Sequence, residues 1–196
     1  KPVAKLLLEQ RADVRATKRD GSNALMAAAL YGHDAEAQLL LEHGADVRTA
    51  DNNGFTALTQ AAQSGHEAAV KLILEHGADV KAATNKGSTP LILAAAGGHK
   101  PVAKLLLEQR ADVRATKRDG SNALMAAALY GHDAEAQLLL EHGADVRTAD
   151  NNGFTALTQA AQSGHEAAVK LILEHGADVK AATNKGSTPL ILAAAG

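Results

Sequence analysis

Histidine is the residue type that most suggests chemistry in this sequence, because five of the nine histidines follow a glycine at intervals of 33 residues. Zinc needs its histidine nitrogens at about 2.0–2.1 Å from one ion. If each histidine belongs to its own helical unit, neighbouring units lie about 8–10 Å apart at their helix axes. Histidines that occur once per unit are therefore too far apart to bind the same metal ion. We therefore expect each ring to help begin a helix and to bond locally, for the set His33, His66, His99, His132 and His165.

Other patterns that could support catalysis or ion binding are incomplete. Asp51-Asn52-Asn53-Gly54 resembles the start of a calcium loop, but such a loop needs Gly sixth and Glu twelfth, and Ala62 stands twelfth. No Gly-x-Ser-x-Gly motif or phosphate-binding glycine loop occurs. The sequence has no cysteine, so disulfides and Cys-based zinc sites are excluded. We expect no enzyme, no cofactor and no metal site.

The composition excludes further classes of protein. The 20 Lys and Arg against 22 Asp and Glu leave a net charge of −2, which argues against a nucleic-acid partner. No apolar stretch is long enough to span a membrane, and no secretion signal is visible. Two Tyr, two Phe and no Trp predict a thin core of Ala, Leu and Val. We expect a cytoplasmic protein without a membrane partner.

The elements that would position these residues are internal repeats. Residues 100–196 repeat residues 1–97 without a difference, and within this 99-residue unit a weaker copy recurs every 33 residues. We predict one domain over 1–196, made of a half repeat 1–17, full repeats 18–50, 51–83, 84–116, 117–149 and 150–182, and a partial repeat 183–196. The perfect identity favours an engineered repeat, or a window on a longer array, over a natural duplication.

Each unit predicts a turn followed by two helices. In the unit from Asp51, Gly54 supplies the positive-φ turn residue and Thr56 stands where a helix needs its N-cap. An Ala-rich run follows and ends at Gly65. A second helix carries Leu-Ile-Leu in its last turns and stops at Gly77, which suits a left-handed cap.

This pattern resembles that of ankyrin repeats along the whole chain. The family pattern G-x-T-P-L-H-x-A-A-x-x-G-H followed by V-x-x-L-L-L-E-x-G-A-D-V-N is matched in spacing and punctuation in every unit. Since one helix pair cannot bury its own apolar face, we expect an all-α helix-turn-helix solenoid with short hairpin tips and a right-handed superhelical stack. The resemblance implies a non-enzymatic scaffold for protein–protein contact.

Three departures from the family pattern carry expectations. The histidine of the TPLH motif is replaced by Met26, Thr59 or Ile92, so the bonds that this histidine makes between repeats should be missing. The Asn of ADVN is replaced by Arg48, Lys81 or Arg114, which should weaken polar bonding between loops. Arg11 and Arg110 replace the cap glycine, where we expect a positive φ.

The resemblance also implies a binding surface, a concave groove formed by the turns and the first helices. Tyr31 and Phe55 belong to adjacent units and could form one apolar step, which Tyr130 and Phe154 repeat; alternatively, the rings fill gaps between units. Exposed aromatics in a groove are typical hot-spot residues. The predicted partner-binding residues are Arg19, Asp20, Ser22, Leu30, Tyr31, Asn52, Asn53, Phe55, Gln63, Asn85, Lys86, Ser88, Tyr130 and Phe154.

The two ends of the chain predict a second kind of contact. The first residues form a second helix without its first helix, and the last residues form a first helix without its second. Copies of the chain are then expected to join end to end through Val3, Leu6, Leu7, Leu190 and Leu192. The rival function to a scaffold with an unknown protein partner is therefore a purely structural solenoid that stacks into a filament.

Overall fold

The computed structural model describes residues 2–195, which form twelve helices joined by turns and contain no strand longer than an isolated bridge. The first helices of the units are α2 (Ala24–Leu30), α4 (Ala57–Ser64), α6 (Pro90–Ala96), α8 (Ala123–Tyr130), α10 (Ala156–Gln162) and α12 (Pro189–Ala195). The second helices are α1 (Pro2–Glu9), α3 (Asp34–Glu42), α5 (Glu67–Glu75), α7 (Lys100–Glu108), α9 (Asp133–Glu141) and α11 (Glu166–Glu174). The expected all-α helix-turn-helix fold is confirmed. Residues 1 and 196, which end the predicted half and partial repeats, lie outside the described residues.

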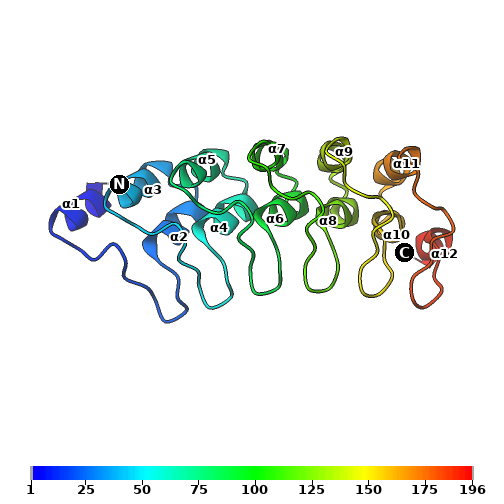
Figure 1. Ribbon diagram of the computed structural model, residues 1–196, viewed down its shortest axis with the longest axis horizontal. Coiled ribbons are helices and arrows are strands. Elements are labelled where there is room, and N and C mark those ends of the chain that lie inside the picture. The colour runs from blue at the N-terminus through cyan, green and yellow to red at the C-terminus, as the bar shows by residue number, and fades with distance from the viewer. Residues whose placement is uncertain (1, 196) are drawn as a thin grey trace.

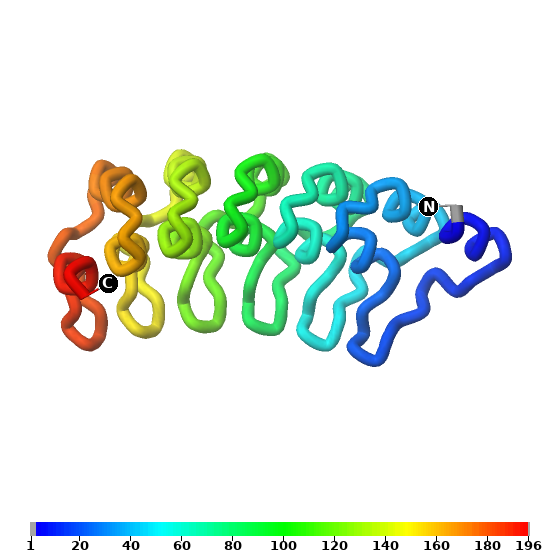
Figure 2. The backbone as a smooth tube through the Cα atoms, turned by 180° about the vertical axis from the view of Figure 1, so that it is seen from behind, coloured from blue at the N-terminus to red at the C-terminus, as the bar shows by residue number. Residues whose placement is uncertain are grey.

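The helices form two rows with the hairpin turns along one edge (Figures 1 and 2). Each first helix from α2 to α12 packs against the next first helix, and each second helix from α3 to α11 packs against the next second helix. Within a unit, the second helix packs on the first. The two helices of each unit therefore contact each other and the helices of the neighbouring units, as expected for a solenoid.

The first helices begin at side-chain caps. Thr56 Oγ1 accepts a hydrogen bond from the N–H of Thr59, and Thr59 Oγ1 accepts one from the N–H of Thr56 at 2.7 Å. This reciprocal capping box satisfies two donors that the helix leaves free. Thr59 stands where the family has its histidine, and its hydroxyl bonds back to Thr56 in its own unit. The hydroxyl of Thr59 is thus used within its own unit, as expected from the missing histidine.

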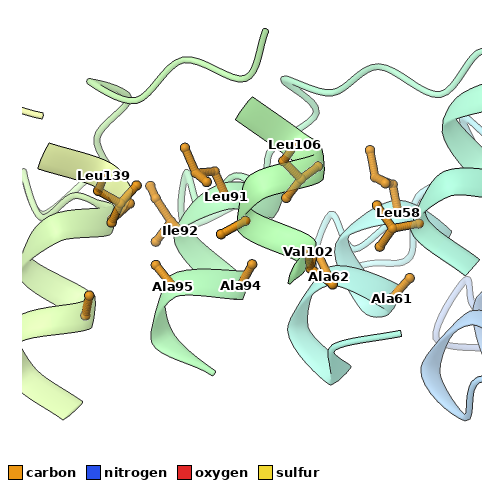
Figure 3. Packing of buried hydrophobic residues seen from close by; sticks show 14 of the residues in the cluster. Leu58, Ala61, Ala62, Leu91, Ile92, Ala94, Ala95, Val102, Leu106 and Leu139 are labelled. Atoms are coloured by element: carbon orange, nitrogen blue, oxygen red, sulfur yellow. The ribbon is translucent and has the colours of Figure 1, made fainter. Parts of the chain in front are cut away.

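The core is built from small and branched aliphatic side chains. Ala61, Ala62 and Ala94 have no exposed surface, so neighbouring helices approach closely at these positions. Leucines such as Leu58 and Leu106 fill the space between the two rows (Figure 3). The buried hydrophobic residues within 2–195 include no aromatic side chain, in agreement with the thin core predicted from composition.

The end residues differ from one another in exposure. Val3, Leu6, Leu7 and Leu190 are exposed, as the sequence predicts for unpaired helix faces. Leu192, which is expected in the same end-to-end contact, is half-buried, and its place in that contact stays a prediction. Ile191, which the sequence analysis did not name, is exposed.

Two arginines hold the left-handed backbone conformation that glycine holds in other units. Arg11 has φ 62° and Arg110 has φ 63°, as expected, whereas the equivalent Gly143 has φ 87°. An L-residue in this conformation brings its Cβ close to the carbonyl oxygen, which costs about 1–2 kcal/mol. The side chain of Arg110 is exposed, so burial does not offset this strain.

Replacing Arg110 by Gly is expected to raise the free energy of unfolding by about 1 kcal/mol, because glycine adopts positive φ without the clash. Urea denaturation measures the change. The matched control is Gly143→Ala at the equivalent cap, which should lower the free energy of unfolding by about the same amount. An unchanged or lower midpoint for Arg110→Gly would show that the guanidinium makes a compensating contact.

Candidate functional site

The Gly-His pairs connect neighbouring units. His66 Nε2 lies 3.1 Å from the carbonyl oxygen of Leu30 in the preceding unit. The same bond joins His99 to Gln63 at 3.0 Å, and the later units repeat it from His132 to Ala96 and from His165 to Leu129. Each of these histidines stands at the N-cap of a second helix but makes no side-chain bond to that helix. For these four the expectation that they bond locally is wrong, because each ring bonds to a carbonyl at the end of the first helix of the preceding unit.

The glycine of each pair makes room for the next histidine. Gly32 has φ +64°, and a Cβ on it would lie 2.6 Å from Nδ1 of His66. A side chain here would therefore be strained by the backbone conformation and would also displace the ring. Gly164, against which no Gly-His pair of a following unit lies among residues 2–195, has nothing within 4 Å of the equivalent point. The recurring glycine thus serves the junction between units as well as the turn.

The described residues form no cluster suited to a metal. Within 2–195, no group of three or more His, Asp or Glu side chains comes close enough to hold an ion. A carbonyl oxygen can only accept, so the Nε2 of each junction histidine donates its proton to it. The geometry therefore gives these rings a structural role.

Replacing His132 by Ala is expected to lower the free energy of unfolding by about 1–3 kcal/mol, because the carbonyl of Ala96 loses its donor in a part-buried junction. The matched control is His142→Ala. His142 Nδ1 bonds to Leu138 of its own helix, and losing this end-of-helix contact should cost less than about 1 kcal/mol. If urea denaturation gives the same loss of unfolding free energy for both variants, the bond between units does not contribute extra stability.

The hairpin turns are linked to one another by a ladder of bonds. The N–H of Asn52 donates to the carbonyl of Asp20 at 2.9 Å, and its Nδ2 donates to that of Arg19 at 3.2 Å. Asn85 repeats this one unit later, donating to the carbonyls of Asn53 and Asn52 at 2.9 Å each. The amide side chains of Asn52 and Asn85 are thus engaged between turns, whereas Asn53 is exposed at a tip.

Bonding between loops was expected to be weak at the positions of Arg48, Lys81 and Arg114. Of these side chains, Arg114 reaches the next unit, with its Nε 3.4 Å from the carbonyl of Gly143. This long contact adds little beside the shorter asparagine bonds of the hairpin ladder. Polar bonding between units therefore depends on the hairpin tips and on the junction histidines.

An aspartate–serine pair recurs on the turns. Asp20 accepts hydrogen bonds from the hydroxyl and the N–H of Ser22, and these bonds lower the pKa of its carboxyl group. In the copy, burial raises the pKa of Asp119, but the bonds from Ser121 and the nearby Lys117 outweigh it and the net shift is downward. Lys117 Nζ lies 3.4 Å from Asp119 Oδ2. Both carboxylates therefore stay charged at neutral pH.

The four aromatic side chains fall into two groups. Tyr31 and Tyr130 are 66% and 56% exposed, whereas Phe55 and Phe154 are half-buried. The ring contact of Tyr31 is to His33 of its own unit, with centroids 6.1 Å apart. Among the described residues, no ring contact joins Tyr31 to Phe55, and the apolar step that they could form stays a prediction. The tyrosines remain as separate exposed rings.

Three more of the predicted groove residues accept bonds from the following unit through their backbone carbonyls. The carbonyls of Leu30 and Gln63 accept the histidine bonds, and that of Lys86 accepts from the N–H of Arg118 at 3.0 Å. The side chains of Gln63 and Lys86 are exposed, and those of Leu30 and Ser88 are half-buried. A partner could therefore contact the side chains of Gln63 and Lys86 fully, and those of Leu30 and Ser88 in part.

A hollow of about 260 Å³ lies between the turns and first helices of three units. Of the predicted residues it brings together Ser88 and Tyr130. Several of the others are not among the predicted residues, although the 99-residue identity makes Asp119 a copy of Asp20 and Ser121 a copy of Ser22. The residues of the hollow that can offer polar groups are Ser88, Lys117, Asp119, Ser121, Tyr130, Asp150 and Gln159.

Replacing Ser121 by Ala is expected to raise the pKa of Asp119 toward its ordinary value, because the carboxylate loses a hydroxyl donor. The stability that this aspartate contributes is present above its unfolded pKa of about 3.9 and is lost as the pH falls through the lower folded pKa. Carboxyl-carbon NMR titration measures the shift. Ser187→Ala, on a different turn, should leave the pKa of Asp119 unchanged; a titration of Asp119 unmoved by Ser121→Ala would refute this cause.

Comparison with known families agrees with this architecture. A family model described as ankyrin repeats in three copies matches residues 1–84, 80–150 and 136–196. Comparison with curated proteins found no match. None of the helices in residues 2–195 is long and apolar enough to cross a membrane.

Proposed function

Because the chain belongs to the ankyrin repeat family, whose repeats are generally protein–protein interaction modules, we propose that it is a non-enzymatic scaffold that binds a protein partner through one face. We call this surface the hairpin face; it consists of the hairpin turns and the first helices. It corresponds to the groove that the family resemblance implies. The hollow beside the exposed ring of Tyr130 carries the proposal.

The chemistry of the hollow suits a side chain of a protein partner. Small-molecule sites usually measure about 300–1,000 Å³ and enclose most of their ligand. The hollow is smaller, at about 260 Å³, and opens onto the hairpin face. Tyr130 supplies an apolar ring with a polar tip, which is a frequent hot-spot residue. One apolar or aromatic side chain of the partner could lie against this ring.

Charged groups around the ring are already oriented. Lys117 is held beside Asp119, and Asp150 Oδ1 accepts bonds at 2.8 Å from the N–H groups of Asn152 and Phe154. Side chains fixed in this way lose little conformational entropy when a partner binds. The carboxylates would favour a partner that brings a basic or hydrogen-bond-donating group next to its anchor.

The phenylalanines stabilise the hairpin turns and are less suited than the tyrosines to contact a partner. Phe55 is half-buried, and its N–H donates to Asp51 Oδ1 at 2.8 Å within its own turn. Replacing it would perturb the hairpin and the binding surface together. The exposed tyrosines are therefore the sharper probes of the proposal.

Peptides selected from a random phage-displayed library against this chain are expected to lose affinity at least tenfold, about 1.4 kcal/mol, when Tyr130 is replaced by Ser. The unfolding midpoint should barely change, because the ring is exposed. Lys71→Ser, on the exposed side of α5, serves as the control and should leave affinity unchanged.

The same selection tests the copy of this ring in the first full unit. If neither Tyr31→Ser nor Tyr130→Ser weakens any selected peptide, the hairpin face is not the binding surface. If the tyrosine variants unfold, the rings serve packing between units and the assignment is wrong.

A second candidate function is a structural solenoid that stacks end to end without an external ligand. It is favoured by the exposed apolar side chains at both ends, such as Leu7 and Leu190. Sedimentation at rising concentration separates the candidates, because a filament grows and a monomeric binder does not.

A further inference from the structure

The hollow beside Tyr130 is open because one unit carries a small side chain where the others carry larger ones. Ala96, at the end of α6, lines the hollow. In the two preceding units Leu30 and Gln63 stand at the position of Ala96. A leucine or glutamine side chain at this position would occupy part of the space. The hollow is therefore specific to the junction between α6 and α8, in the middle of the stack.

The deepest part of the hollow is apolar and belongs to α6 and α8, which pack side by side (Figure 1). Ile92 and Met125 are buried, and Leu129 is half-buried. We call this part the apolar floor; its residues are Ile92, Leu93, Ala96, Met125, Ala126 and Leu129. A side chain that enters must place carbon atoms on this floor, because burying apolar surface against it is favourable and burying an unpaired polar group is not.

The rim of the hollow carries one positive group and two negative groups, Lys117, Asp119 and Asp150. Lys117 Nζ is paired with Asp119 Oδ2 at 3.4 Å. Asp150 forms no ion pair among the described residues 2–195. Its Oδ1 accepts bonds from two N–H groups of its own turn, which hold the carboxylate in place. The rim therefore has one fixed carboxylate without a counter-charge.

Arginine is the side chain whose chemistry matches both the floor and the rim. Its methylene stem packs on apolar surface while its charged head stays near water. The planar guanidinium stacks on aromatic rings and pairs with carboxylates through two parallel bonds. An aromatic anchor would cover Asp150 without supplying a donor, which costs free energy. Lysine would supply a charge but no plane to stack on Tyr130.

We propose that the hollow binds an arginine side chain of the protein partner, with its stem on the apolar floor and its guanidinium between the ring of Tyr130 and the carboxylate of Asp150. Both groups line the same hollow of about 260 Å³, so one guanidinium can reach both. Lys117 opposes it little, because Asp119 balances its charge. This inference rests on the proposed function, since it names the partner residue that the hairpin face recognises.

Changes in the peptide test the arginine. Peptides selected from the phage-displayed library against the 196-residue chain are expected to contain an arginine whose replacement by citrulline weakens binding at least tenfold. Citrulline keeps the length and the planar head but carries no charge, so the loss reports on the pairing with a carboxylate. Replacement by lysine should also weaken binding, because an ammonium group cannot stack on the ring. Isothermal titration calorimetry measures the affinities.

A change in the chain tests the carboxylate. Asp150→Asn removes the charge but keeps an oxygen that accepts the bonds from Asn152 and Phe154. It should weaken the arginine peptides at least tenfold. The matched control is Asp79→Asn, which removes the same charge from a turn where Oδ1 accepts a bond from the N–H of Lys81 at 2.9 Å. Asp79 does not line the hollow, so this control should leave the affinity unchanged.

Combining the two changes shows whether the arginine and Asp150 contact each other. If they pair, citrulline costs at least tenfold on the unchanged chain but less than about threefold on the Asp150→Asn variant, since the interaction is already lost. Equal costs on both chains would place the arginine elsewhere and overturn the proposal. Thermal melting should show that Asp150→Asn is folded; if it is not, the citrulline peptides still decide whether a charged arginine is the anchor.

A third variant tests the hollow itself. Ala96→Leu introduces the residue that stands at this position as Leu30, so the fold should accommodate it. The carbonyl of residue 96 would still accept the bond from His132, because only the side chain changes. The added side chain should weaken the arginine peptides at least tenfold. Unchanged binding by this variant would show that the hollow is not the site.

The results distinguish this proposal from the proposed function. If Tyr130→Ser weakens the selected peptides but citrulline and Asp150→Asn do not, the hairpin face binds through an aromatic or aliphatic anchor and the arginine is wrong. If no peptide is selected, or if no peptide is weakened by either tyrosine variant, the proposed function fails and this proposal fails with it.

Discussion

The structure depends on one constraint, which is that no helix pair can bury its own apolar face. The fully buried Leu58 and Leu106 reach that state because neighbouring units close over them. The bonds from His66 to Leu30 and from Asn52 to Arg19 join the same neighbours at two further levels. Packing, the histidine bonds and the hairpin ladder thus all act across the junction between units, so the stability of the stack is approximately a sum over junctions.

Much of the fold could be predicted because its signals are local in the sequence. The caps at Thr56 and Gly65, and the positive φ of Arg110, follow from residue type at one position of a 33-residue period. The role of the histidines could not be predicted in this way. His66 and its acceptor Leu30 are 36 residues apart, and the period alone does not say which face of one unit meets the next.

The candidate site was predicted less completely for a similar reason. The family resemblance names positions on the hairpin face, but it does not say which side chains the turns already use. Asn52 and Asn85 are engaged between turns and Phe55 is half-buried, whereas the ring of Tyr130 is exposed at the edge of a hollow. That hollow needs residues from three units, so it exists only when the units are stacked.

The histidine bonds have a consequence for how such a chain can change. Their acceptors are backbone carbonyls, and the acceptor residues already differ in type among Leu30, Gln63 and Ala96. A carbonyl is the same group whatever side chain it accompanies, so the coupling imposes no choice of residue there. These positions border the hairpin face. The chain can therefore vary the residue type at these positions without losing the histidine bonds.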